Sequence, residues 1–152
     1  MFQKIHIIFG FIFSLILLLL FPEIGWFGFI SIFASSVLID VDHYLFYAVT
    51  KKDWSLKNAY NWFFEGEKKF KKLLLKEKKE SKQIPCIFHG IEFIIILLVL
   101  IYFNFYRQFL IYILLGIVFH QVLDFIYIKD NHFKLNHLGS QIYNIIVYIR
   151  NP

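Results

Sequence analysis

The nine residues from Ser35 to His43, SSVLIDVDH, decide how the rest of the chain is interpreted. Two carboxylates and one imidazole stand within four residues, at the end of an apolar run that begins near Gly25. Ionisable side chains are costly in so apolar a segment, and they are kept mainly where they pair, bind an ion or line a polar cavity. On a helix, Asp40 and His43 share a face, while Asp42 points to one side of it. Because carboxylates and imidazoles ligate divalent ions, this stretch is a candidate metal site.

The composition indicates a membrane protein. Of the 152 residues, 59% are hydrophobic and 21% are aromatic, whereas soluble domains are about 45–50% apolar. The net charge is +5, but the lysines cluster beside apolar runs, which favours contact with anionic lipid headgroups over binding of nucleic acid. The single cysteine, Cys86, excludes an internal disulfide and gives no redox indication. We therefore expect a single-domain, all-α, polytopic membrane protein.

The apolar runs predict four transmembrane helices, and the length of each lies within the roughly 17–25 residues that cross a bilayer. Along the chain they cover about residues 5–21, 25–47, 86–106 and 109–128. The first run lacks a small-residue cleavage site, so we interpret it as a retained span. Residues 51–82 form a lysine-rich loop with interleaved aromatics, which is typical of amphipathic helices on a membrane surface, although a solvated hairpin without a lipid role is the alternative. Within residues 132–150, an apolar stretch too short to cross predicts an interfacial tail helix.

Positive charge predicts the orientation. If the N-terminus is cytoplasmic, every lysine and arginine except Arg107 lies on the inner side of the membrane. Because Lys and Arg concentrate on the cytoplasmic side, we expect both termini in the cytoplasm, in a bacterial-type inner membrane.

This topology brings ionisable residues from all four spans to one depth. Two pairs have helical spacing: His89 with Glu92, and His120 with Asp124, so the members of each pair should share a face. Polar residues kept only for helix packing would not be expected to share a depth, so the layer predicts one common site. Its members are His6, Asp40, Asp42, His43, His89, Glu92, His120 and Asp124.

At these residues the chain resembles the LexA-regulated, membrane-bound metal-dependent hydrolases, a family of small inner-membrane proteins. The family pattern is a His near the N-terminus, D-x-D-H at the end of an apolar helix, an H-R-G-x-T-H-S helix start, and H-x3-D in the last conserved span. The matching residues are His6, Asp40–His43 (DVDH), His89 and His120–Asp124 (HQVLD). The chain departs from the pattern at Ile84-Pro85, which replace the first His and the Arg of the third motif, and at Ile39, which replaces a proline. The lost His-Arg pair bears on substrate handling more than on metal binding.

The residues and the resemblance together favour a metal-dependent hydrolase at the cytoplasmic leaflet, with a phosphate-containing lipid as substrate. In this hypothesis Asp40 or Asp42 bridges two ions, and Glu92 or Asp124 serves as general base. Loop lysines such as Lys51, Lys52 and Lys82 attract the anionic lipid. One or two zinc or manganese ions are held by His6, Asp40, Asp42, His43, His89, His120 and Asp124.

Two other classes of function stay open at this point. The same residues could bind metal or protons without catalysis, although four spans without inverted-repeat symmetry are few for a transporter. Alternatively, the polar layer only pins helices together, and the lysine–aromatic loop recruits anionic lipid or a protein partner that the sequence does not identify. A catalytic metal site keeps an open position and a structural one is closed, whereas a packing layer holds no metal.

Overall fold

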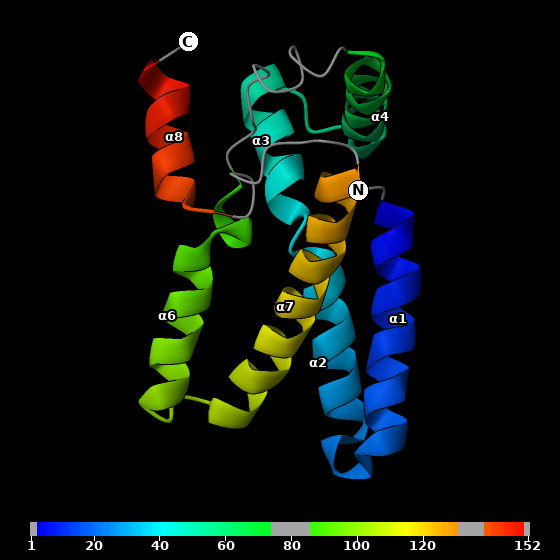
Figure 1. Cartoon of the computed structure of the whole chain (residues 1–152), viewed down its shortest axis with the longest axis vertical. Helices are drawn as coiled ribbons and strands as arrows, with labels where there is room; N and C mark the ends of the chain where they lie inside the picture. The colour runs from blue at the N-terminus through cyan, green and yellow to red at the C-terminus, as the bar shows by residue number, and fades with distance from the viewer. Residues whose placement is uncertain (1–2, 74–85, 131–138, 151–152) are drawn as a thin grey trace.

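A computed structural model describes residues 3–73, 86–130 and 139–150 (Figure 1). The described part is all-helical, without strands, which confirms the predicted all-α class. Its elements are α1 Gln3–Leu20, η1 Pro22–Ile24, α2 Gly25–Leu38, α3 Val41–Lys51, α4 Leu56–Lys72, η2 Ile87–His89, α6 Ile91–Tyr102, α7 Arg107–Asp130 and α8 Gln141–Arg150.

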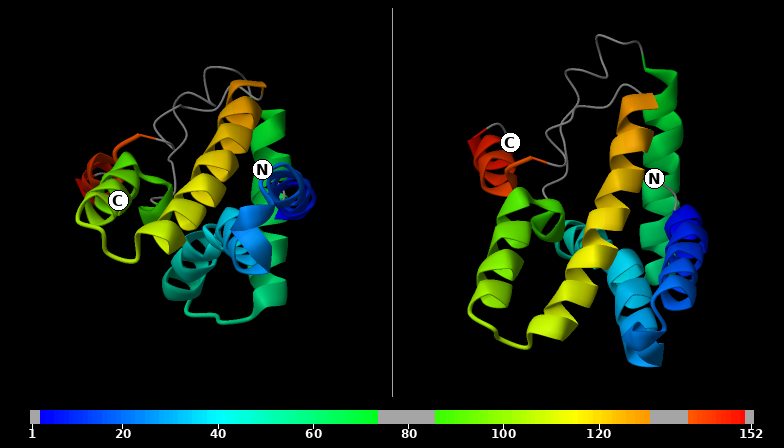
Figure 2. Two further views of the ribbon diagram at one scale, coloured as in Figure 1. Left: turned by 90° about the horizontal axis from the view of Figure 1, so that it is seen from below. Right: turned by 60° about the horizontal axis from the view of Figure 1, so that its bottom comes forward.

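Helices α1, α2, α7 and α6 lie side by side, with α2 packed against both α1 and α7 (Figures 1 and 2). Helix α3 continues beyond α2, and α4 and α8 lie at the same end of the molecule. A Cβ atom on Gly116 of α7 would collide with the backbone carbonyl of Ile32 on α2. The two helices therefore touch through backbone, as in small-residue packing between membrane helices.

The side chains of this bundle are distributed in the opposite way to those of a soluble protein. Large apolar side chains face outward, among them Leu19 (71% exposed), Ile30 (58%) and Ile96 (54%), whereas His6 and Ser14 are buried. Monomeric soluble proteins rarely expose apolar patches this extensive, and such patches mark contact with a membrane or with another protein. Two helical stretches, Pro22–Lys51 and Arg107–Lys129, are long and apolar enough to cross a membrane.

Two of the predicted spans are shorter or less regular than expected. The predicted span 25–47 is divided, because α2 ends at Leu38 and α3 begins at Val41. In the predicted span 86–106, Gly90 is extended (φ −77°, ψ 150°) and separates η2 from the 12-residue helix α6. At 1.5 Å per residue α6 is about 18 Å long, less than the roughly 30 Å hydrocarbon core. By length and composition two of the four expected spans qualify: Pro22–Lys51, which contains the interrupted span 25–47, and Arg107–Lys129. Helices α1 and α6 are shorter.

The lysine-rich loop and the tail each contain one described helix. Helix α4 begins after Ser55, whose side chain accepts a hydrogen bond from the Asn58 N–H, and it carries three lysines in its last turn. Helix α8 forms the described part of the predicted tail. The predictions for 74–82 and 132–138 fall outside the described residues.

Asp53 joins the end of α3 to the start of α4. Its carboxylate accepts hydrogen bonds from the Tyr47 hydroxyl (2.6 Å), the Asn58 side-chain amide (2.8 Å) and the Ser55 N–H (2.9 Å). These donors, Tyr47 foremost, hold the pKa of Asp53 below its ordinary value. A depressed carboxyl pKa contributes stability above the unfolded pKa of about 3.9, and the contribution is lost as pH falls through the folded pKa.

We expect the α3–α4 junction to loosen below about pH 4, where Asp53 takes up a proton. Amide hydrogen exchange of residues 53–60, corrected for intrinsic rates, should accelerate as pH falls in the wild type. The Asp53→Asn variant cannot titrate at this position and should lose that acceleration. The same pH profile in both proteins would show that Asp53 does not hold the junction.

Candidate metal centre

The interruption between α2 and α3 brings three of the predicted ligands toward the bundle interior. The chain turns at residues 39–40, and the His43 N–H bonds the Asp40 carbonyl (3.1 Å) at i+3 instead of i+4. Asp40 lies 3.7 Å from His43 Nε2, as their spacing predicts, and Asp42 faces His89 Nδ1 at 3.1 Å. Because Asp40 and Asp42 are almost fully buried, their charges need nearby cationic partners.

Three further elements contribute side chains to the same place. Helix α1 supplies His6, η2 supplies His89, and α7 supplies His120 and Asp124. His89 and His120 are 0% exposed and His6 is 1% exposed. All seven predicted metal ligands thus lie together, as the shared-depth argument predicts.

A carboxylate contact orients the imidazole of His89, and a backbone contact orients that of His120. His120 Nδ1 lies 2.8 Å from the Ser36 carbonyl oxygen, which can only accept, so Nδ1 carries a proton and donates it. His89 Nδ1 lies 3.1 Å from Asp42 Oδ2, so it donates likewise. In the neutral tautomers, both Nε2 atoms then present lone pairs.

These Nε2 atoms face each other across 3.2 Å, and carboxylate oxygens surround them. Asp40 Oδ1 lies 3.4 Å from His89 Nε2 and 3.5 Å from His120 Nε2. Asp124 Oδ2 lies 3.2 Å from His120 Nε2 and 3.7 Å from His89 Nε2. Lone pairs that converge in a buried space repel one another unless a proton or a metal cation lies among them.

The spacing of these atoms fits a metal ion. Two ligand atoms each bonded at 2.0–2.2 Å to one tetrahedral ion are about 3.4 Å apart, and the four contacts to Asp40 and Asp124 are 3.2–3.7 Å. Three sets of residues have ligand atoms within 4.8 Å of one another: Asp42–His43–Cys86–His89, His6–Asp40–His120, and His89–His120–Asp124. The cluster is therefore a potential metal-binding site.

His6, from α1, contacts the two cluster residues of α7. Its ring stacks on His120 at a centroid distance of 3.8 Å, and its Nε2 lies 3.2 Å from Asp124 Oδ1. Both contacts explain why a histidine at the start of the first apolar helix is fully buried.

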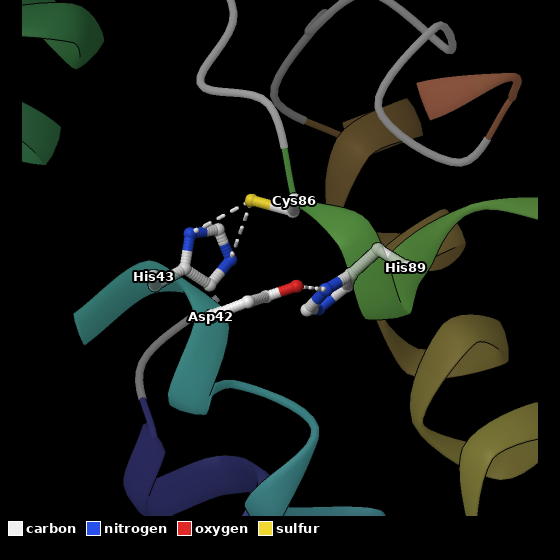
Figure 3. A group of neighbouring side chains, drawn as sticks. All are labelled: Asp42, His43, Cys86 and His89. Carbon is white, nitrogen blue, oxygen red and sulfur yellow. Dashed lines mark hydrogen bonds and ion pairs between the residues drawn. The ribbon is translucent and has the colours of Figure 1, made fainter. Parts of the chain in front are cut away.

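Cys86 was not among the predicted ligands, but the structure brings it to the cluster (Figure 3). Cys86 is fully buried, and its Sγ lies 3.2 Å from His43 Nδ1. Its spacing from His89, Cys-x2-His, was the available signal, because two ligands three residues apart can reach one ion.

Glu92, a predicted general base, does not join the cluster. Gly90 ends the short helix that holds His89, so the predicted shared face of His89 and Glu92 does not form. The Glu92 carboxylate instead accepts hydrogen bonds from the Ser140 hydroxyl and the Gln141 N–H at the start of α8. The positive end of the α8 dipole stabilises a carboxylate at this position.

Helix α4 lies over one side of the cluster. Phe63 packs edge-on against the His43 ring at 5.7 Å, and the Tyr127 hydroxyl of α7 donates to Glu67. The lysine-rich loop is therefore anchored beside the site by its described helix.

No protein-family model, curated protein or solved structure matches this chain. The resemblance to the LexA-regulated hydrolases rests on the motifs alone and stays a prediction.

Proposed function

We propose that the protein is a membrane-embedded, metal-dependent hydrolase that acts at the cytoplasmic leaflet. The observation that carries this proposal is the convergence of His89 Nε2, His120 Nε2 and the Asp40 and Asp124 carboxylates in one buried space. Three carboxylates with neutral imidazoles carry a charge of about −3, and two divalent ions would nearly balance it. The mixed nitrogen and oxygen ligands suit zinc or manganese.

The surface supports a membrane location with the site on the lysine-bearing side. The α1–α2 and α6–α7 turns lie at the opposite end of the molecule (Figure 1), and exposed aromatic residues stand at or beside both turns. They include Trp26, Tyr102, Phe103 and Tyr106, and such belts mark a membrane–water boundary. We therefore propose that α1 and α6 cross the inner membrane together with the two candidate spans. They are the shorter helices of a four-helix bundle whose two termini lie in the cytoplasm.

The chain's residues have separable roles in this proposal. Asp42 and the Ser36 carbonyl hold His89 and His120 in the tautomers that leave Nε2 available. Asp40, whose Oδ1 lies within 3.5 Å of both Nε2 atoms, would hold metal together with them, and Asp124 is the remaining candidate for general base. Bound ions would supply polarisation of a phosphoryl group and activation of water.

The described lysines favour an anionic lipid as substrate. Lys68, Lys69, Lys71 and Lys72 lie on the last turns of α4, the helix that covers His43. Lysines near a membrane surface attract anionic headgroups by about 1 kcal/mol each, so they would concentrate a phosphate-bearing lipid beside the site.

A second candidate function is metal or proton binding without catalysis. The burial of His6, His89 and His120 favours it, because a structural site is closed to substrate. The two candidates differ in whether bound metal exchanges readily and whether water reaches it.

The test is the metal content of the full-length protein, purified in mild detergent without chelator. The hydrolase proposal expects one or two equivalents of zinc or manganese and hydrolysis of phosphodiester or phosphomonoester lipids. The Asp124→Asn variant should lose the hydrolysis and the metal at the His89–His120 pair. Metal without hydrolysis of any of these lipids would support the non-catalytic candidate. A folded wild type that takes up no added zinc or manganese would overturn the hydrolase proposal and leave proton binding as the function of the cluster.

A further inference from the structure

Cys86 and His43 lie beside the His89–His120 pair, outside the space where the Nε2 atoms of His89 and His120 face each other. Figure 3 shows the Cys86 sulfur turned toward the His43 ring, with Asp42 reaching His89 below them in the view. The distance from Sγ to His43 Nδ1 is 3.2 Å, which is within the separation of two ligands on one ion.

Asp42 provides a second, independent observation that points to a cation site. Its Oδ2 accepts from the Phe88 N–H (3.0 Å) and faces His89 Nδ1 (3.1 Å). Its Oδ1 is buried and has no hydrogen-bond partner among the described residues. A buried carboxylate oxygen without a partner costs free energy, and a cation bound at Oδ1 would remove that cost.

The backbone of Cys86 is held in place from the tail of the chain. The Cys86 N–H donates to Gln141 Oε1 (3.0 Å), and the Gln141 N–H donates to Glu92 Oε2 (3.1 Å). Glu92 and α8 thus fix the position of the cysteine. Glu92, which was predicted as a general base, therefore has a structural role here.

We propose that Asp42 Oδ1, His43 and Cys86 Sγ form a second zinc site, next to the site that includes His89 Nε2 and His120 Nε2. Three protein ligands of three types leave one coordination position open, which is the arrangement of reactive zinc sites. The thiolate makes the site prefer zinc over manganese or magnesium, since sulfur is a soft ligand. Binding deprotonates the thiol, and the proton passes to solvent. Asp42 then links the two sites, with Oδ1 on the new ion and Oδ2 on His89.

Cobalt substitution tests this site without reference to activity. The full-length protein in mild detergent, loaded with Co²⁺ in place of its own metal, should show the near-ultraviolet charge-transfer absorption of a cobalt–thiolate bond. Cys86 is the chain's one cysteine, so such a band reports this residue alone. Cys86→Ser should abolish the band and lower bound cobalt by about one equivalent, whereas His120→Ala should keep the band.

The outcomes separate this site from the proposed function. Wild-type protein that binds cobalt without a thiolate band would overturn the second site and leave the hydrolase proposal standing. A thiolate band in a protein that hydrolyses no lipid would support the second site and count against the hydrolase. A band that survives in Cys86→Ser would show that the absorption has another origin, and it would overturn the assignment.

Discussion

Replacing His89 by alanine is expected to remove nearly all metal bound at the His89–His120 pair. The two ring nitrogens of His89 lie within 3.7 Å of groups from two other segments: Asp40 and Asp42 at the start of α3, and His120 and Asp124 on α7. Loss of residues that merely orient a ligand lowers metal affinity about 10- to 100-fold, so loss of this central imidazole should exceed that range. Titration of purified protein with zinc, read by isothermal calorimetry, measures the change.

Glu92→Gln is the matched control for this variant. Glu92 is another ionisable residue of the same segment, but it bonds the start of α8 instead of the cluster. We expect it to change zinc affinity at the His89–His120 pair little. If His89→Ala binds zinc as tightly as the wild type, or if Glu92→Gln loses binding as severely, the assignment of the site to the converging Nε2 atoms is wrong.

Gly116→Ala is expected to destabilise the bundle and weaken the site together. A Cβ at residue 116 would collide with the Ile32 carbonyl oxygen and would stand 3.0 Å from the Ser36 N atom. Because these are backbone atoms, α2 and α7 must move apart, at a cost of about 1–3 kcal/mol. The same movement separates the Ser36 carbonyl from His120 Nδ1, so thermal unfolding in detergent and zinc affinity should both decrease.

Gly66→Ala is the control for the glycine substitution. Gly66 lies in α4, and an added Cβ would have no neighbour within 4 Å. Alanine is favoured over glycine inside a helix by up to about 1 kcal/mol, so this variant should be as stable as the wild type or more so. Equal melting temperatures for Gly116→Ala and the wild type would contradict close backbone packing of α2 on α7.

The residues that cluster could be predicted because ionisable side chains in apolar runs are informative. His6, Asp42 and His120 stand in apolar runs where a charge is costly, and the expected topology put them at one depth. The structure brings them together for the same reason, since the bundle interior is where such groups find partners. The all-α class followed from the same apolar runs, because a helix bonds its own backbone groups.

Glu92 and Cys86 are residues whose surroundings the helical spacing of the sequence does not predict. The i,i+3 spacing of His89 and Glu92 predicts a shared face only on a continuous helix, and Gly90 interrupts it. The environment of Cys86 depends on His43, which is 43 residues away. Local spacing carries no information about such a contact.

By itself, the sequence determined that this chain is helical, apolar on its outside and supplied with metal-type ligands at one level, because those properties depend on composition and local spacing. Only the tertiary structure decided which lone pairs converge. The turn at Ile39–Asp40 and the extended Gly90 redirect the chain, and the Ser36 carbonyl and Asp42 then orient the imidazoles. Tautomer and ligand direction depend on contacts between distant segments, which exist only once α2 and α7 have packed.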